Sequence, residues 1–189
     1  MNEFNGNKYE FLNFININSE DKEIVLSWRN DESIRKWMYS QVPITLENHL
    51  NFIELLKIRK DKLYFLVKRN DENIGVFSLV DFDGFKGELG YYLSPDKHNG
   101  NLGVEFYYAI LKYCFDCIEI KKIEGFALEE NKGANSLNSL FGFEKLKDTR
   151  ELKEGVFFQI ILTVETWKNT VVNNLKIKKL LNLTNNTKH

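Results

Sequence analysis

The chain has 189 residues, of which 43% are hydrophobic and 28% are charged, and its formal net charge is -1. This composition is typical of one globular domain and argues against a disordered or fibrous chain. Because the charges nearly cancel, no overall positive potential is available to hold DNA or RNA, so we expect no nucleic-acid partner.

The first ten residues are polar and lack the apolar core of a signal peptide. No later stretch reaches the ~18 consecutive apolar residues of a membrane span. We therefore expect a cytoplasmic protein that does not insert into a membrane.

The first third of the chain is expected to contain one strand followed by helices. Residues 9–17 are rich in aromatic and β-branched side chains and predict the strand. Apolar residues recur at helical spacing in 21–29 and in 33–39. Pro43 then breaks the chain, and Thr45 is a suitable N-cap for a further helix.

The rest of the chain predicts a mixed sheet. Turn residues separate three strands expected at 63–68, 73–82 and 88–93. An amphipathic helix from Gly103 and a strand at 122–128 form a crossover between parallel strands. The final predicted elements are a short helix and two strands, at 131–140, 143–151 and 156–164.

These elements predict an α/β (α+β) fold with a single domain over residues 1–166. Its sheet is expected to be mixed and mostly antiparallel, with helices on its faces. Residues 167–189 alternate Asn, Lys and Leu, and we expect them to form at most a loosely docked helix.

The segment 88–103 is the best candidate for binding a ligand. It runs from a strand through a glycine-containing loop into a helix, where unpaired N–H groups and the helix dipole favour an anion such as pyrophosphate. Gly100 and Gly103 allow a phosphate to approach the backbone closely. A plain strand-to-helix connection is the alternative explanation of the same spacing.

Other functional motifs are missing from the sequence. It contains no Walker A loop, no dinucleotide-binding G-x-G-x-x-G, no H-E-x-x-H and no G-x-S-x-G. With only three His residues, we expect no metal site. Cys114 and Cys117 lie within a predicted apolar helix, which favours a core role over zinc binding or redox chemistry.

Two patterns resemble those of the GNAT superfamily, the Gcn5-related N-acetyltransferases, over about residues 9 to 165. The family's pyrophosphate loop, [Q/R]-x-x-G-x-[G/A], aligns with His98, Asn99, Gly100, Asn101, Leu102 and Gly103, with His98 and Asn101 departing from the pattern. Its second signature, N-x-x-A followed by G-F, appears as Asn131, Ala134, Gly142 and Phe143. The resemblance implies a sheet that splays between two parallel strands, acetyl-CoA as cofactor, and acetyl transfer to an amine.

The resemblance also implies roles for individual residues. Glu88 is the expected general base, although a solvated strand-end carboxylate is the alternative, and Ser78 is expected to orient the substrate or a water. Asn138 stands where many relatives carry a Tyr that protonates the leaving thiolate. We expect hydrogen bonding by Asn138, a water, or Tyr91 or Tyr92 to replace that acid. The implied cofactor-binding residues are those of the 98–103 loop together with Tyr91, Tyr92, Leu93, Asn131 and Asn138.

The first third resembles the N-acetyltransferases of pseudaminic acid biosynthesis more narrowly. The matching blocks are Trp28-Arg29-Asn30, Trp37-Met38-Tyr39-Ser40, His49 to Ile53, and Tyr64-Phe65-Leu66. Those enzymes acetylate the 4-amino group of a UDP-linked 4-amino-4,6-dideoxy sugar. The resemblance implies that this nucleotide-linked amino-sugar is the partner and that its pocket contains Arg29, Met38, Tyr39, His49 and Phe52.

The chemistry of these residue types agrees with that role. An Arg side chain can pair with a diphosphate, and Tyr or Phe can cover a uracil or sugar face. Met38 and Phe52 are equally expected as core residues, because both are apolar.

Other functions remain open at this stage. The acceptor could be a ribosomal protein N-terminus, a polyamine or a different amino-sugar, or the chain could be a CoA-binding module with weak activity. Exposed edge strands can pair between chains, so both a monomer and a homodimer are compatible with the sequence.

Overall fold

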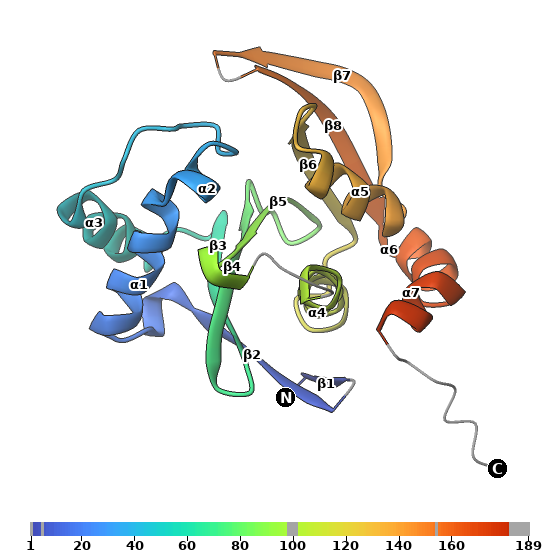
Figure 1. Ribbon diagram of the computed structural model, residues 1–189, viewed down its shortest axis with the longest axis horizontal. Coiled ribbons are helices and arrows are strands. Elements are labelled where there is room, and N and C mark those ends of the chain that lie inside the picture. The colour runs from blue at the N-terminus through green and yellow to red at the C-terminus, as the bar shows by residue number, and fades with distance from the viewer. Residues whose placement is uncertain (1, 5, 98–101, 154, 182–189) are drawn as a thin grey trace.

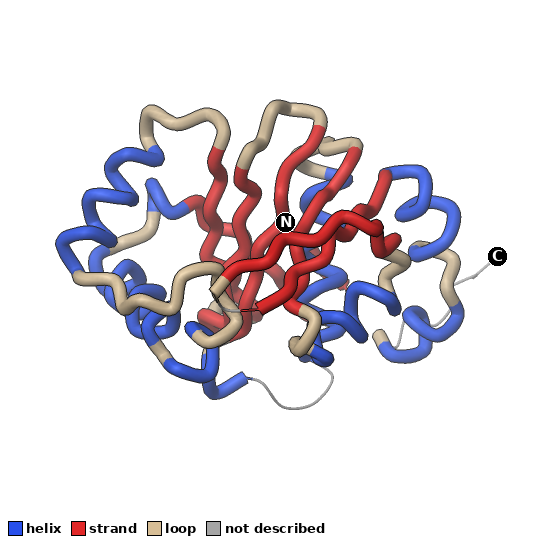
Figure 2. Tube along the Cα trace, turned by 90° about the horizontal axis from the view of Figure 1, so that it is seen from above, coloured by secondary structure: helices blue, strands red, loops and turns tan. Residues whose placement is uncertain are grey.

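The computed structural model describes residues 2–4, 6–97, 102–153 and 155–181. Figure 1 shows a twisted sheet with one group of helices on its left and a second group on its right. Figure 2, seen from above, shows the strands in the middle of the molecule between these helices. This arrangement confirms the predicted α/β fold.

The sheet has eight strands in the order β1-β2-β3-β4-β5-β6-β8-β7. All neighbouring strands are antiparallel except β5 and β6, which are parallel. The strands are β1 (Asn2–Phe4), β2 (Asn7–Asn13), β3 (Lys62–Arg69), β4 (Glu72–Val80), β5 (Lys86–Leu93), β6 (Lys122–Leu128), β7 (Glu144–Leu152) and β8 (Gly155–Thr163).

The helices follow from their caps and apolar faces. The side chains of Asn18, Thr45 and Asn131 accept hydrogen bonds from the backbone three residues later and begin α1, α3 and α5. The helices are α1 (Ser19–Asn30), α2 (Glu32–Arg35), α3 (Leu46–Leu56), α4 (Leu102–Asp116), α5 (Lys132–Leu140), α6 (Val164–Thr166), the π-helical turn η3 (Trp167–Val171) and α7 (Leu175–Leu180).

Each face of the sheet carries its own hydrophobic cluster. Side chains alternate between the two faces of a strand, so Phe65 and Val67 of β3 belong to the cluster with α4, whereas Leu66 belongs to the cluster with α1 and α3. Tyr91 and Tyr92 of β5 divide between the clusters in the same way. The central strands are therefore covered on both faces, and β5 contributes to each.

The structure corrects two element boundaries. The strand expected at 9–17 ends at Asn13, whose side chain accepts a hydrogen bond from the Ile15 N–H and starts a 3₁₀ turn. The helix expected at 33–39 ends at Arg35. Beyond it, Arg29 and Arg35 donate to the carbonyls of Ser40 and Gln41 and hold a loop instead.

The segment after residue 166 packs more closely than expected. Trp167 is only 2% exposed and stacks on Phe115, with ring centroids 5.5 Å apart. Val171, Ile177 and Leu181 are buried in the same cluster, so their apolar side chains dock residues 167–181 onto the domain. No helix in the described ranges is long and apolar enough to cross a membrane.

Candidate active site

The two parallel strands of the sheet pair over only part of their length. β5 and β6 are in register at Lys86, Gly87 and Glu88, and the pairing ends there. Along a strand of an antiparallel pair, backbone N–H groups point alternately toward and away from the partner strand. The Ser94 N–H donates to the Ile74 carbonyl of β4, 2.9 Å away, so the N–H groups at even-numbered positions of β5 point toward β4. Those of Leu89 and Tyr91 point away from β4. The Leu89 N–H therefore faces Glu124, the last paired residue of β6, whereas the Tyr91 N–H faces the gap that opens beyond this pair.

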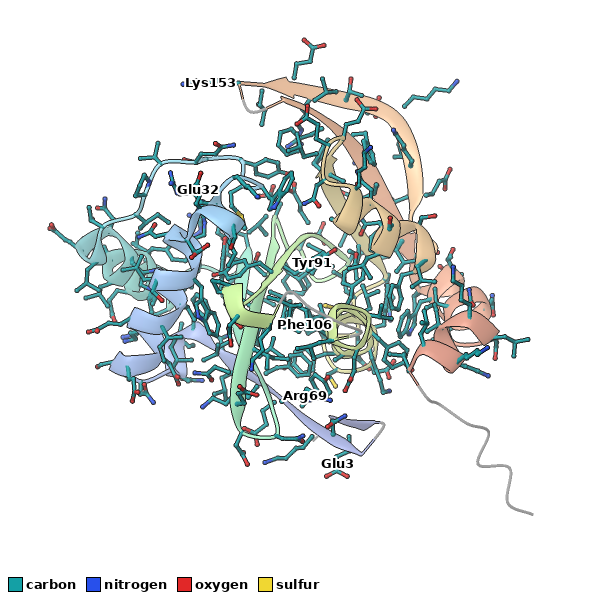
Figure 3. All side chains as sticks on the ribbon, viewed as in Figure 1. Glu3, Glu32, Arg69, Tyr91, Phe106 and Lys153 are labelled. Carbon is teal, nitrogen blue, oxygen red and sulfur yellow. The ribbon has the colours of Figure 1, made fainter. Side chains whose placement is uncertain are left out.

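A cavity of about 520 Å³ occupies this gap. Figure 3 shows Tyr91 of β5 and Phe106 of α4 at the centre of the molecule, and both line the cavity. Other parts of its wall come from β6, α5 and β8, including Phe126, Asn131, Asn138 and Phe157. We call this space the gap cavity.

A second cavity, of about 410 Å³, lies toward α1 and α3. We call it the helix-side cavity. It shares six lining residues with the gap cavity, so the two spaces meet along β5; the shared residues are Met38, Tyr39, Glu88, Gly90, Tyr91 and Tyr92.

Glu88 is placed where the two cavities meet. Its Oε1 accepts a hydrogen bond of 2.6 Å from the Tyr39 hydroxyl. The Tyr39 ring lies 5.1 Å from that of Phe157 on β8. Burial and the contact with Glu88 raise the pKa of Tyr39, so its hydroxyl stays protonated and keeps donating.

Glu124 is the register partner of Glu88, but its surroundings differ. Burial favours a higher pKa for this carboxyl, and the ammonium groups of Lys122, 2.6 Å away, and Lys86, 3.4 Å away, outweigh that effect and lower the pKa. Glu88 has no lysine or arginine partner among the described residues. Both carboxylates line the gap cavity, but only Glu124 is paired with lysine side chains.

The helix-side cavity contains two polar groups without partners. Arg29 donates through Nη2 to the Ser40 carbonyl, 2.9 Å away, whereas its buried Nη1 has no hydrogen-bond partner within the described part of the chain. His49 is 6% exposed, and its buried Nε2 is likewise unpartnered there. Burial lowers the pKa of both residues, which favours a neutral His49 imidazole.

On the opposite side of β5, Asn138 is 6% exposed and lines the gap cavity. Its Oδ1 accepts a hydrogen bond of 2.7 Å from the hydroxyl of Tyr107 on α4. The Tyr107 ring stacks on Tyr91, with centroids 4.4 Å apart. Sequence reasoning missed Tyr107, because it lies in an amphipathic helix whose apolar face is expected to be core.

Comparison with known proteins agrees with this geometry. A family model described as an acetyltransferase (GNAT) domain matches residues 12–144. The chain is a GNAT acetyltransferase. The acetyltransferase is also 30% identical to acetyltransferase PseH of Campylobacter jejuni over 125 residues, which cover 66% of this chain and 78% of the relative.

Solved structures share the fold of the acetyltransferase. C. jejuni N-acetyltransferase PseH in complex with acetyl coenzyme A matches with a TM-score of 0.67 at 24% identity, over 83% of this chain and 99% of that one. Spermidine N-acetyltransferase from Vibrio cholerae, in complex with CoA and spermine, matches with a TM-score of 0.76 at 14% identity, over 86% and 98%.

The acetyltransferase uses acetyl-CoA to acetylate an amine, and its gap suits this co-substrate. The N–H group of Tyr91, which lies beyond the residues paired with β6, can donate to an amide oxygen of an extended pantetheine arm, as it would to a neighbouring strand. The gap cavity has the volume expected of a small-molecule site.

Most of the residues singled out in the sequence lie around these two cavities. The gap cavity is lined by Met38, Tyr39, Glu88, Tyr91, Tyr92, Leu93, Gly103, Asn131 and Asn138. The helix-side cavity is lined by Arg29, Met38, Tyr39, His49, Phe52, Ser78, Glu88, Tyr91 and Tyr92. Leu102 begins α4 without lining either cavity.

Three sequence expectations have separate outcomes. The loop residues His98, Asn99, Gly100 and Asn101 lie outside the described residues. Phe52 both lines the helix-side cavity and packs against the core, with its ring 4.9 Å from that of Tyr64. Cys114 is buried as expected, but Cys117 is exposed, because it follows the last turn of α4.

Proposed function

We propose that this acetyltransferase acts on the 4-amino group of a UDP-linked 4-amino-4,6-dideoxy sugar, as a cytoplasmic enzyme of pseudaminic acid synthesis. Its similarity to acetyltransferase PseH supports the pathway. The observation that carries the proposal is the unpartnered, buried Nη1 of Arg29 in the helix-side cavity.

The two charged residues of the helix-side cavity suit an acceptor that carries both an amine and a diphosphate. Among the described residues that line it, Arg29 is the only cationic group and Glu88 is the only acidic one. A diphosphate can supply the hydrogen-bond acceptor that the buried Nη1 of Arg29 lacks. A polyamine would instead bring several positive charges to a cavity with a single carboxylate, which is a poor match.

The walls of the same cavity suit a nucleoside and a sugar. Phe52 and Tyr64 offer aromatic surface that can cover a uracil ring. The neutral His49 imidazole has an unpartnered Nε2 that can accept a hydrogen bond from a hydroxyl group. Met38 and Tyr39, on the loop after α2, complete the proposed substrate-binding set.

On the other side of β5, we propose that the gap cavity binds acetyl-CoA. When bound, acetyl-CoA supplies an activated carbonyl carbon with a thiolate as the leaving group. The backbone of residues 91–93 and the side chains of Asn131 and Asn138 lie along the cavity that would hold it. The start of α4 at Leu102 and Gly103 presents the positive end of a helix dipole that can bind the pyrophosphate.

Direct transfer requires a base between the two cavities, and Glu88 lies at that junction. In the proposed reaction its carboxylate accepts the proton that the acceptor nitrogen loses, directly or through water. Tyr39 holds the carboxylate through the 2.6 Å hydrogen bond. Ser78, on β4 opposite Gly90, faces the helix-side cavity, where it can orient the acceptor or a water.

The proposal is tested by incubating the enzyme with acetyl-CoA and a panel of acceptors while measuring CoA release. The panel contains UDP- and dTDP-linked 4-amino-sugars, the 4-amino-sugar without nucleotide, spermidine, and a peptide with a free N-terminus. We expect the highest kcat/KM with the UDP-linked sugar. Faster acetylation of spermidine or of the peptide would refute the proposed acceptor, and binding of acetyl-CoA without any turnover would support a CoA-binding module instead.

A further inference from the structure

The side-chain amide of Asn138 has one polar end engaged and the other open. Its Oδ1 accepts the hydrogen bond from Tyr107. Its Nδ2 makes no hydrogen bond with any described residue. This atom is nevertheless accessible, because it is not among the buried polar atoms that lack a partner. Because Asn138 lines the gap cavity, the open NH₂ group faces the space assigned to acetyl-CoA.

Tyr107 is held firmly in the orientation that makes this contact. It is 1% exposed, stacks on Tyr91 at 4.4 Å and meets Phe141 edge-on at 5.2 Å. Burial raises the pKa of Tyr107 well above its usual value, so the hydroxyl keeps its proton. Rotating the Asn138 amide by half a turn would remove the acceptor of this buried O–H group, which carries a penalty.

We propose that Tyr107 is a positioning residue that orients the Asn138 amide, so that the Nδ2 group donates a hydrogen bond to the departing sulfur of coenzyme A. As the acceptor nitrogen bonds to the carbonyl carbon, the C–S bond breaks and its electron pair leaves on sulfur. Asn138 stabilises the resulting thiolate by donating an N–H hydrogen bond and gives up no proton. Water then protonates the thiolate, which at a pKa near ~8.5 is a tolerable leaving group.

The two residues together thus take the role that a single general acid, a Tyr at position 138, has in many relatives. Asn138 contacts the sulfur, whereas Tyr107 acts only through Asn138. This division rests on acetyl transfer from acetyl-CoA and does not depend on the acceptor proposed above. It can therefore be tested with any amine that the enzyme acetylates.

Binding of coenzyme A provides a test that does not rely on turnover. Calorimetry at a pH above the thiol pKa compares the affinity for coenzyme A with that for desulfo-coenzyme A, which lacks the sulfur. The ratio of the two affinities measures the preference for coenzyme A. We expect this ratio to fall by about two- to tenfold in Tyr107→Phe, which corresponds to the contribution of one hydrogen bond. An unchanged preference in Tyr107→Phe would overturn the positioning role.

Asn138→Asp separates the two ends of the amide. The Asp side chain keeps an oxygen that can accept from Tyr107, so packing is preserved, but it has no N–H group to offer the sulfur. We expect this variant to lose the preference for coenzyme A completely, and to unfold at a lower temperature than the wild type because the introduced carboxylate is buried. A retained preference would overturn the assignment of Nδ2 as the donor, even if Tyr107→Phe failed to fold.

A double-mutant cycle separates positioning from a general structural role. With Asn138 present, Tyr107→Phe should lower kcat with little change in the KM for acetyl-CoA; in an Asn138→Ala background it should lower kcat no further. Equal losses in both backgrounds would refute the coupling. Tyr113→Phe is the matched control, because it removes a hydroxyl from the same helix where the ring packs against Phe11.

Discussion

The Tyr39 hydroxyl and the Glu88 carboxylate, joined by a hydrogen bond of 2.6 Å, connect the loop after α2 to the last residue of β5 that pairs with β6. Both side chains line both cavities. The contact therefore lies where the proposed acetyl-CoA and acceptor sites meet, and the loop that is proposed to bind the acceptor also holds the proposed base.

Glu88→Gln should lower kcat by about 10²- to 10⁴-fold, the usual contribution of a general base, while acetyl-CoA affinity stays close to wild type. Steady-state kinetics and calorimetry with acetyl-CoA measure the two quantities. Glu124→Gln is the control, because the register partner is already paired with Lys122 and Lys86. Similar losses in the two variants would argue against a specific role for Glu88.

Tyr39→Phe should lower kcat less than Glu88→Gln, because it removes one hydrogen bond to the base and keeps the ring beside Phe157. In the Glu88→Gln background the same change should have little further effect. Kinetics of the two single variants and the double variant measure this coupling. Additive losses would show that Tyr39 acts independently of Glu88.

Arg29→Ala should raise the KM for the UDP-linked acceptor by about 10- to 100-fold, as expected for loss of a hydrogen bond between charged groups. The KM for acetyl-CoA should change little, because Arg29 lines only the helix-side cavity. Arg59→Ala, which removes an exposed arginine paired with Asp61, is the control. A larger effect on acetyl-CoA than on the acceptor would contradict the assignment of the two cavities.

His49 should make the folded state less stable in mild acid. Burial lowers the pKa of His49, so below its ordinary pKa of about 6.5 the unfolded chain binds a proton that the folded chain does not. The free energy of unfolding should therefore fall as the pH decreases from 7.5 to 5.5. Urea unfolding of the wild type and of His49→Gln across this range should show a smaller decrease in the variant, and parallel curves would exclude this contribution.

Trp167→Ala should destabilise the domain by about 3–5 kcal/mol, the usual effect of removing a buried Trp side chain. Trp167 is 2% exposed and packs between Tyr108 and Phe115. Lys168→Ala, at an exposed position next to it, is the control. Chemical unfolding measures both, and a loss below about 1 kcal/mol for Trp167→Ala would mean that the C-terminal segment adds little to the core.

The element order was accessible from the sequence because its signals are local. N-caps such as Thr45 and Asn131, turn residues and the helical spacing after Gly103 depend only on nearby residues. The predicted ends of helices were less accurate where side chains hydrogen-bond to the backbone of a following segment. The helix expected to reach Tyr39 ends at Arg35, where arginine side chains bind the carbonyls of the following loop.

By itself, the sequence determined the fold class and the acetyltransferase family, and most of the residues that it singled out lie around the two cavities. The tertiary structure alone decided which of them touch. Tyr39 and Glu88 are 49 positions apart, and Tyr107 and Asn138 are 31 apart. Neither contact leaves a local pattern, because each depends on how strand register and helix packing bring distant segments together.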